Sequence, residues 1–327
     1  MKEKVDIFFS SGQAPVRLDV ILAERLGISR SLAARLCETG AVVVDGRARK
    51  PSFTIKPGMR ITGSIVREEV EDREIPEWEV PLKVIHEDES ILVIDKPAGL
   101  VVHPGAGNTG ETLVNALVAR HPGIRSVGSP DRPGIVHRLD KLTSGVMVVA
   151  LTREAHEKLG VAFAAHEHAR EYRALCYGTP AYTKGTIETW MGRNPKDRTR
   201  MSSRVTSGRK AITHWDIEQQ WSQITLLRLT LETGRTHQIR VHLSDYGHPV
   251  VGDPQYGGRR RANTLADPAV RAAVKACRRQ MLHSSLLGIT HPKTGQWMEF
   301  TGALPEDMQH LIALLNEREQ GGVDLLP

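Results

Sequence analysis

The first 63 residues show helical and then strand periodicity in their apolar positions. Apolar side chains recur at the three- and four-residue spacing of one helix face at Leu18, Ile21, Leu22 and Leu26. Gly27 is expected to end this helix, and Ser29 is the expected N-cap of a second short helix. Three valines at 42–44 then run into an Asp-Gly turn. The pattern predicts a small module of two helices and a hairpin over residues 1–63.

A larger region begins near residue 81 and alternates short strands with helices. The runs that predict strands lie at 91–95, 146–151, 171–178 and 224–231. Helical periodicity is found at 111–120, 153–165 and 305–316. Because the strands are short and the helices lie between them, we expect an α+β fold with a mainly antiparallel sheet over residues 81–327.

Residues 64–80 separate these two regions and are rich in acidic side chains. Seven Glu or Asp residues lie between positions 67 and 79, and the stretch is closed by Pro76 and Pro81. This composition predicts a flexible linker between two domains.

The chain as a whole is basic, with a formal net charge of +6 and a pI near 9.3. Two segments, 190–210 and 259–279, are especially rich in Arg and Lys. Such a charge favours a polyanionic partner, although a solvated surface of mixed charge is an alternative that the pattern leaves open.

Several classes of protein are disfavoured by what the sequence lacks. Three scattered cysteines form no CxxC pair, and the fourteen histidines show no spaced set of metal ligands. No apolar run approaches the roughly 20 residues of a membrane helix, and the start lacks the hydrophobic region of a secretory signal. We therefore expect a cytoplasmic protein without a cofactor, a metal or a membrane partner.

The most informative stretch is His-Arg-Leu-Asp-Lys-Leu-Thr-Ser-Gly at 137–145, directly before the apolar run. A carboxylate at the entrance to a buried strand is expensive to desolvate, so Asp140 needs a partner or a chemical role. The simpler alternative is a turn aspartate that caps the amides of Thr143 and Ser144.

This stretch resembles the active-site motif of pseudouridine synthases, in particular the RluA/RluD family that modifies ribosomal RNA. The resemblance implies that Asp140 is the catalytic residue, acting either as a nucleophile or by removing a ribose proton, and that no cofactor is needed. It also implies that Arg235, in Thr-Gly-Arg-Thr-His-Gln-Ile-Arg, pairs with Asp140 and keeps it ionised. A phosphate contact or a surface ion pair is the alternative for Arg235.

The same resemblance assigns three more residues to the substrate. Tyr172 matches the tyrosine that stacks on the target base, although a half-buried strand tyrosine is the alternative. Arg138 matches an arginine that fills the gap left by a flipped nucleotide. Leu287 lies where relatives place an aliphatic residue beneath the uracil, and core packing is the stronger interpretation there.

The N-terminal module resembles the S4 RNA-binding domain, through Arg-Leu-Asp at 17–19 and Val-Val-Asp-Gly-Arg at 43–47. The resemblance implies an RNA-binding role for Arg30, Arg35, Arg47 and Arg49. A purely structural pair of basic helices is the alternative.

Together these features predict an enzyme that isomerises uridines of large-subunit ribosomal RNA to pseudouridine. Its expected partner is ribosomal RNA, within pre-ribosomal or assembled large subunits, and the expected state is a monomer. Two alternatives are a synthase that acts on tRNA and a non-catalytic RNA-binding factor of ribosome assembly.

Overall fold

The structure is a computed structural model that describes residues 2–10, 14–28, 30–66, 75–103 and 110–320. The chain divides into two compact units, Met1–Ile75 and Pro76–Pro327, and each is described here by itself.

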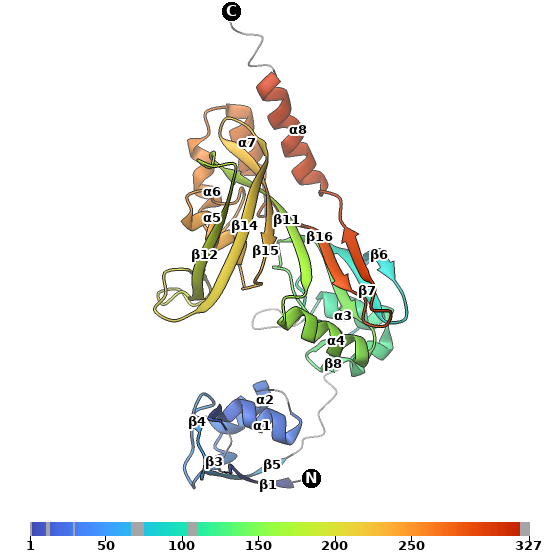
Figure 1. The fold of residues 1–327 in the computed structure, drawn as a ribbon, viewed down its shortest axis with the longest axis vertical. Coiled ribbons are helices and arrows are strands. Elements are labelled where there is room, and N and C mark those ends of the chain that lie inside the picture. The colour runs from blue at the N-terminus through green and yellow to red at the C-terminus, as the bar shows by residue number, and fades with distance from the viewer. Residues whose placement is uncertain (1, 11–13, 29, 67–74, 104–109, 321–327) are drawn as a thin grey trace, which may run out of the picture. The chain divides into compact units, whose positions relative to one another are not determined.

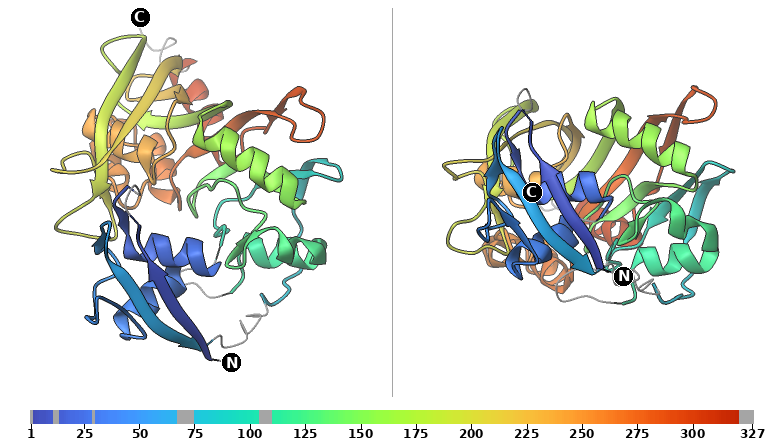
Figure 2. Two further views of the ribbon diagram at one scale, coloured as in Figure 1. Left: turned by 60° about the horizontal axis from the view of Figure 1, so that its bottom comes forward. Right: turned by 90° about the horizontal axis from the view of Figure 1, so that it is seen from below.

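The N-terminal unit combines two helices with a three-stranded antiparallel sheet of order β1-β5-β3 (Figure 2). Its elements are β1 (Lys2–Phe8), β2 (Val16–Arg17), α1 (Leu18–Leu26), α2 (Arg30–Glu38), β3 (Val42–Val44), β4 (Thr54–Ile55) and β5 (Arg60–Val66). The core between helices and strands is apolar and includes Leu18, Leu22, Val42, Ile55 and Ile61. Burial of this surface supplies most of the driving force for folding of the unit.

The two predicted helices are present in this unit, but of the predicted hairpin only the turn and a single bridge between Val44 and Arg47 are found, since β3 pairs with β5. Gly27 ends α1 in the left-handed conformation at φ 62°. Asp45 and Gly46 both have positive φ, and the backbone groups of Val44 and Arg47 bond to each other across the turn. Ser29, the expected N-cap, lies outside the described residues.

Two features of this unit differ from the expected boundaries. β1 was not predicted, because its pairing with β5 joins residues about 60 positions apart. β5 continues to Val66, past the expected end of the module at residue 63. Of the expected linker, residues 67–74 lie outside the described part of the chain.

The C-terminal unit is built on a ten-stranded sheet of order β13-β12-β14-β15-β11-β16-β10-β7-β6, with β17 also paired to β16 (Figure 1). The strands are β6 (Lys83–Glu87), β7 (Ile91–Lys96), β10 (Ser144–Ala150), β11 (His168–Tyr177), β12 (Lys184–Arg193), β13 (Met201–Ser202), β14 (Arg209–Gln220), β15 (Ile224–Leu231), β16 (Leu282–Thr290) and β17 (Trp297–Thr301). A separate short ribbon pairs β8 (Gly128–Ser129) with β9 (Arg132–Pro133). Only β10 and β16 run parallel among the paired strands described, so the predicted α+β fold with a mainly antiparallel sheet is confirmed.

Helices and 3-10 turns connect the strands of this unit. They are α3 (Leu113–Arg120), η1 (Pro122–Ser126), α4 (Arg153–Ala164), α5 (Gln238–Asp245), α6 (Gly258–Arg261), η2 (Ala262–Thr264), α7 (Pro268–Ala276) and α8 (Glu306–Gln320). Apolar side chains of α7 and α8 pack with those of β11 and β15 in one buried cluster. The helices predicted at 111–120, 153–165 and 305–316 correspond to α3, α4 and α8, whereas α5 and α7 were not predicted.

The sheet branches at β16. One edge of β16 pairs with β11, and its other edge pairs first with β10, at His283 and Ser284, and then with β17, from Leu286 onward. A register shift opposite Tyr172 leaves Ser285 as an extra residue, which forms a β-bulge. The loop that precedes β10 therefore ends where two parts of the sheet meet.

None of the described helices is both long and apolar enough to cross a membrane. The described residues also contain no group of three or more His, Cys, Asp or Glu side chains that could hold a metal ion.

Candidate active site

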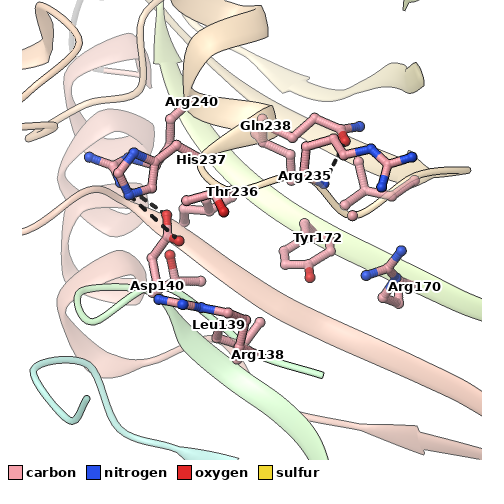
Figure 3. A pocket seen from close by; sticks show the side chains of 15 residues that line it. Arg138, Leu139, Asp140, Arg170, Tyr172, Arg235, Thr236, His237, Gln238 and Arg240 are labelled. Carbon is pink, nitrogen blue, oxygen red and sulfur yellow. Dashed lines mark hydrogen bonds and ion pairs between the residues drawn. The ribbon is translucent and has the colours of Figure 1, made fainter. Parts of the chain in front are cut away.

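Asp140 lies in the loop directly before β10, and its side chain lines a cavity (Figure 3). The amide of Thr143 donates to the backbone carbonyl of Asp140 at 3.1 Å, which closes a turn and leaves the carboxylate directed elsewhere. Only 17% of the Asp140 side chain is exposed. The carboxylate is bonded to an arginine, so capping of the following amides does not describe its position.

That arginine is Arg240, on the first turn of α5. Its Nη1 donates to Oδ2 of Asp140 at 2.9 Å, and 4% of its side chain is exposed. The prediction that Arg235 pairs with Asp140 is therefore wrong. Arg235 lines the same cavity, but its Nε donates to the backbone carbonyl of Lys210 at 3.1 Å. The reason is that Arg235 lies in the loop before α5, whereas the helix turns Arg240 toward the carboxylate.

A second carboxylate, Asp253, also binds Arg240 and fixes its position. Nε and Nη2 of Arg240 donate to the two oxygens of Asp253 at 2.7 and 3.1 Å, and Nη2 also donates to Gln255 at 3.0 Å. Burial works against the charge on Arg240, but the hydrogen bonds and charge of Asp253, aided by Asp140, raise its pKa above the ordinary value. Such a bidentate pair fixes the plane of the guanidinium and leaves Nη1 for Asp140.

His237 is the second basic group near the carboxylate. Its Nε2 lies 3.9 Å from Oδ1 of Asp140, too far for a hydrogen bond, and its Nδ1 is 2.8 Å from the Tyr256 hydroxyl. Burial lowers the pKa of His237, although Asp140 opposes this shift, so the ring is neutral near neutral pH. Its backbone is left-handed, with φ 57°, a conformation that non-glycine residues rarely adopt.

The loop that carries Arg235 and His237 is fixed by the side chain of Gln238. Oε1 of Gln238 accepts from the Thr233 hydroxyl at 2.8 Å and from the Arg235 amide at 3.0 Å. Its Nε2 donates to the Ile212 carbonyl and to the Thr213 hydroxyl on β14. This buried amide therefore ties the start of α5 to the sheet and sets which residues face the cavity.

Tyr172, on β11, lines the cavity at the bulge of β16. The residue is 6% exposed, and burial raises the pKa of its hydroxyl. Arg170, two residues earlier on the same face of the strand, also lines the cavity. Figure 3 shows the Tyr172 ring between Asp140 and the Arg170 side chain.

Arg138 is exposed and lines the cavity two residues before Asp140. Leu287, by contrast, is 1% exposed and does not line it, so the structure does not support the assignment of Leu287 to the substrate. Leu282, five residues earlier on β16, lines the cavity instead. Five residues along a strand span about 16 Å, which accounts for the difference.

A buried lysine, Lys96, contacts the backbone of the Asp140 loop. Nζ of Lys96 donates to the carbonyls of Pro97 and Leu100 at 2.8 and 2.9 Å and lies 3.4 Å from that of Lys141. Burial lowers the pKa of Lys96 to about 7, although Asp140 opposes the shift. These bonds join the proline- and glycine-rich loop after β7 to the residue that follows Asp140.

The predicted RNA-binding residues of the N-terminal unit are only partly described. Arg35 and Arg47 are exposed, and the Arg49 guanidinium lies over the Phe53 ring at 4.7 Å from its centroid. The side chain of Arg30 lies outside the described residues.

Sequence reasoning missed Arg240, His237, Asp253, Gln238 and Arg170. For Arg240 the sequence offers one signal, a second arginine five residues after Arg235. For Asp253 the signal is the glycine-punctuated turn Gly-Asp-Pro-Gln-Tyr-Gly at 252–257. The structure shows that the carboxylate of this turn is fully buried.

The chain is similar to known proteins over both of its units. Residues 90–245 match the family described as RNA pseudouridylate synthase, and residues 16–61 match the S4 domain. The chain is 40% identical over 310 residues to ribosomal large subunit pseudouridine synthase D of Xanthomonas campestris, which covers 94% of this chain and 92% of that protein. The protein of the same name from Pseudomonas aeruginosa is 42% identical over 311 residues, with 94% of each chain covered.

Solved structures show the same fold. Human RNA pseudouridylate synthase domain containing 4 superposes with a TM-score of 0.54 at 23% identity, over 72% of this chain and 93% of that one. The human domain-containing protein 1 gives a TM-score of 0.52 at 24% identity, over 72% and 95%. With relatives about 40% identical along almost its whole length, this chain belongs to the RNA pseudouridylate synthase family.

Proposed function

We propose that this protein isomerises uridines of large-subunit ribosomal RNA to pseudouridine, with Asp140 as its catalytic residue. The observation that carries the proposal is the chain of charges Asp140–Arg240–Asp253 beside Tyr172 in one cavity. The relatives named as large-subunit synthases support the choice of substrate.

The geometry suits Asp140 for either role that the reaction offers. Oδ2 is bonded to Arg240, while the 3.9 Å to His237 leaves Oδ1 without a hydrogen bond from that ring. A buried guanidinium stabilises the ionised carboxylate, which is the form that attacks a ribose carbon or removes a ribose proton. Because Arg240 is fixed by Asp253, the carboxylate is also held in one orientation.

Tyr172 would stack on the target base, and Arg138 would fill the gap that the base leaves in the RNA. Stacking on an aromatic face contributes roughly 1–3 kcal/mol per base and tolerates rotation of the base within its plane. Arg138, exposed at the cavity, is placed to enter the stack from which the uridine is extracted.

The N-terminal unit would supply affinity for structured ribosomal RNA, through Arg35, Arg47, Arg49 and Arg30. The protein would act as a monomer on RNA of pre-ribosomal or assembled large subunits. A non-catalytic assembly factor would need basic surfaces only, and would not need the Asp140–Arg240 pair.

The test is to map pseudouridines in ribosomal RNA from cells with the protein, without it, and with Asp140→Asn. We expect specific large-subunit positions to lose pseudouridine in the last two cases. Purified wild-type protein should form pseudouridine at the same positions in an unmodified 23S-type transcript. The proposal would be contradicted if large-subunit RNA kept all its pseudouridines in these cells, whether tRNA lost pseudouridine or not.

A further inference from the structure

Two arginines of the cavity have no carboxylate partner among the residues that the structure describes. Arg170 and Arg235 lie on the far side of the Tyr172 ring from Asp140 (Figure 3). In the described part of the chain neither forms an ion pair, whereas Arg240 bonds to two carboxylates. The nearest acidic residues in sequence are engaged elsewhere, Glu171 with Arg173 and Glu232 with His214.

Arg170 is partly buried among other basic groups. Its Nε is buried and has no hydrogen-bond partner among the described residues. The rings of His137 and His168 lie close enough to sense its charge, and burial together with Arg170 lowers their pKa values to about 3 and about 4. These histidines are therefore neutral at physiological pH and add no further positive charge beside Arg170.

Gly234 provides the space that Arg170 occupies. A Cβ at position 234 would lie 2.5 Å from Nη1 of Arg170, closer than Cβ atoms come to other heavy atoms, so the guanidinium would have to shift. Since Gly234 directly precedes Arg235, the Arg170 guanidinium rests against the backbone that presents Arg235. Burial and repulsion from Arg209 and Arg170 lower the pKa of Arg235, which shows that like charges are gathered here.

Uncompensated cations that are partly desolvated are costly, and an anion with several acceptor oxygens would relieve that cost. An RNA strand brings such an anion on either side of every nucleotide. We propose that Arg170 and Arg235 form a two-arginine cradle for one phosphodiester next to the target uridine, with Gly234 kept small so that both guanidiniums fit. This inference rests on the proposed RNA substrate, and it assigns the phosphate contact to two named side chains.

A carbonyl oxygen of the uracil is the competing ligand for the same donors. A neutral carbonyl does not offset two adjacent positive charges, whereas a phosphate does, and bidentate contact with phosphate is a geometry that arginine favours. The two ligands differ in a measurable way, because only a phosphate contact changes the salt dependence of binding.

The binding experiment uses the full chain and a single-stranded oligouridine, titrated over a range of salt concentrations. Arg170→Gln should weaken binding by roughly 10-fold, since a hydrogen bond to a charged group contributes on that scale. It should also reduce the slope of log K against log salt by about 0.7, the value for one contact on a single strand. Gly234→Ala should reproduce much of this loss without removing a charge, because it displaces the guanidinium.

The matched control is Arg228→Gln, which removes the same charge from the same sheet. Arg228 is half exposed and lies 3.9 Å from Asp216, and it does not line the cavity. An equal slope for Arg170→Gln and wild type, or equal effects of Arg170→Gln and Arg228→Gln, would overturn the cradle.

Steady-state kinetics on the RNA that the wild-type protein modifies give a second way to distinguish a phosphate contact from a uracil contact. A phosphate contact predicts that Arg170→Gln acts mainly on KM, with partial recovery by Arg170→Lys. A loss confined to kcat would instead place Arg170 on the uracil and overturn the proposal. Because the salt slope needs no turnover, the cradle is tested even if large-subunit RNA proves not to be the substrate.

Discussion

Replacement of Arg240 by Met should destabilise the protein and abolish its activity, and the two effects can be separated. Arg240 is 4% exposed and Asp253 is completely buried, so the single change leaves a buried carboxylate without its counterion. Removal of one partner of a buried pair typically costs about 3–5 kcal/mol. The double variant Arg240→Met with Asp253→Asn removes both charges and should recover most of the lost stability. Its activity should remain absent, because Asp140 still lacks its guanidinium.

The assay is denaturant unfolding of the full chain followed by tryptophan fluorescence. All five tryptophans lie in the C-terminal unit, so the signal reports on the unit that holds the pair; they are Trp78, Trp190, Trp215, Trp221 and Trp297. Arg235→Met is the matched control, since that arginine has no carboxylate partner among the described residues and should change stability little. Wild-type stability of Arg240→Met, or recovery of turnover by the double variant, would refute the reasoning.

Three further predictions follow from other parts of the structure. Tyr172→Phe should retain much more turnover than Tyr172→Ala if stacking is the main role, and equal losses would assign the role to the hydroxyl. A truncated protein that starts at residue 76 should bind structured ribosomal RNA more weakly than the full chain, and its binding should depend less steeply on salt. At saturating RNA it should still catalyse turnover. A truncated protein that folds but shows no turnover would indicate that the N-terminal unit helps to build the site. Although burial opposes it, hydrogen bonds from His86, from two backbone amides and from His291 lower the pKa of Asp88 below its ordinary 3.8. The stability that this contributes is present above pH 3.8 and is lost as pH falls through the folded-state pKa, so the stability difference between wild type and Asp88→Asn should narrow in acid. A pH-independent difference in denaturant unfolding would contradict this assignment.

The motif at 137–145 was sufficient to single out Asp140, whose carboxylate the structure places at the cavity. Its catalytic role stays a prediction. The buried strand that follows, and the turn closed by Thr143, are both encoded within ten residues. The α+β class and the family were also predicted, and both are confirmed.

The counterion of Asp140 could not be chosen in the same way. Whether Arg235 or Arg240 faces the carboxylate depends on where α5 begins, and that is set by bonds from Gln238 to residues 25 and 26 positions earlier on β14. The choice between Leu282 and Leu287 likewise depends on position along β16 and on a bulge in its pairing with β11. Nonlocal pairing therefore decides which arginine faces the carboxylate and which leucine of β16 enters the cavity. For Leu287 the stronger interpretation, core packing, agrees with its burial.

The branching of the sheet at β16 has a consequence for when the enzyme becomes competent during synthesis. Asp140 and Arg240 come from parts of the chain 100 residues apart, and β16, the strand that joins β10 to β11, is made after both. Gln280, just before β16, then donates to Thr143 and closes the Asp140 loop. We therefore expect a chain that ends before Gln280 to hold the Asp140 carboxylate without a fixed counterion, and only a chain that includes β16 to be active.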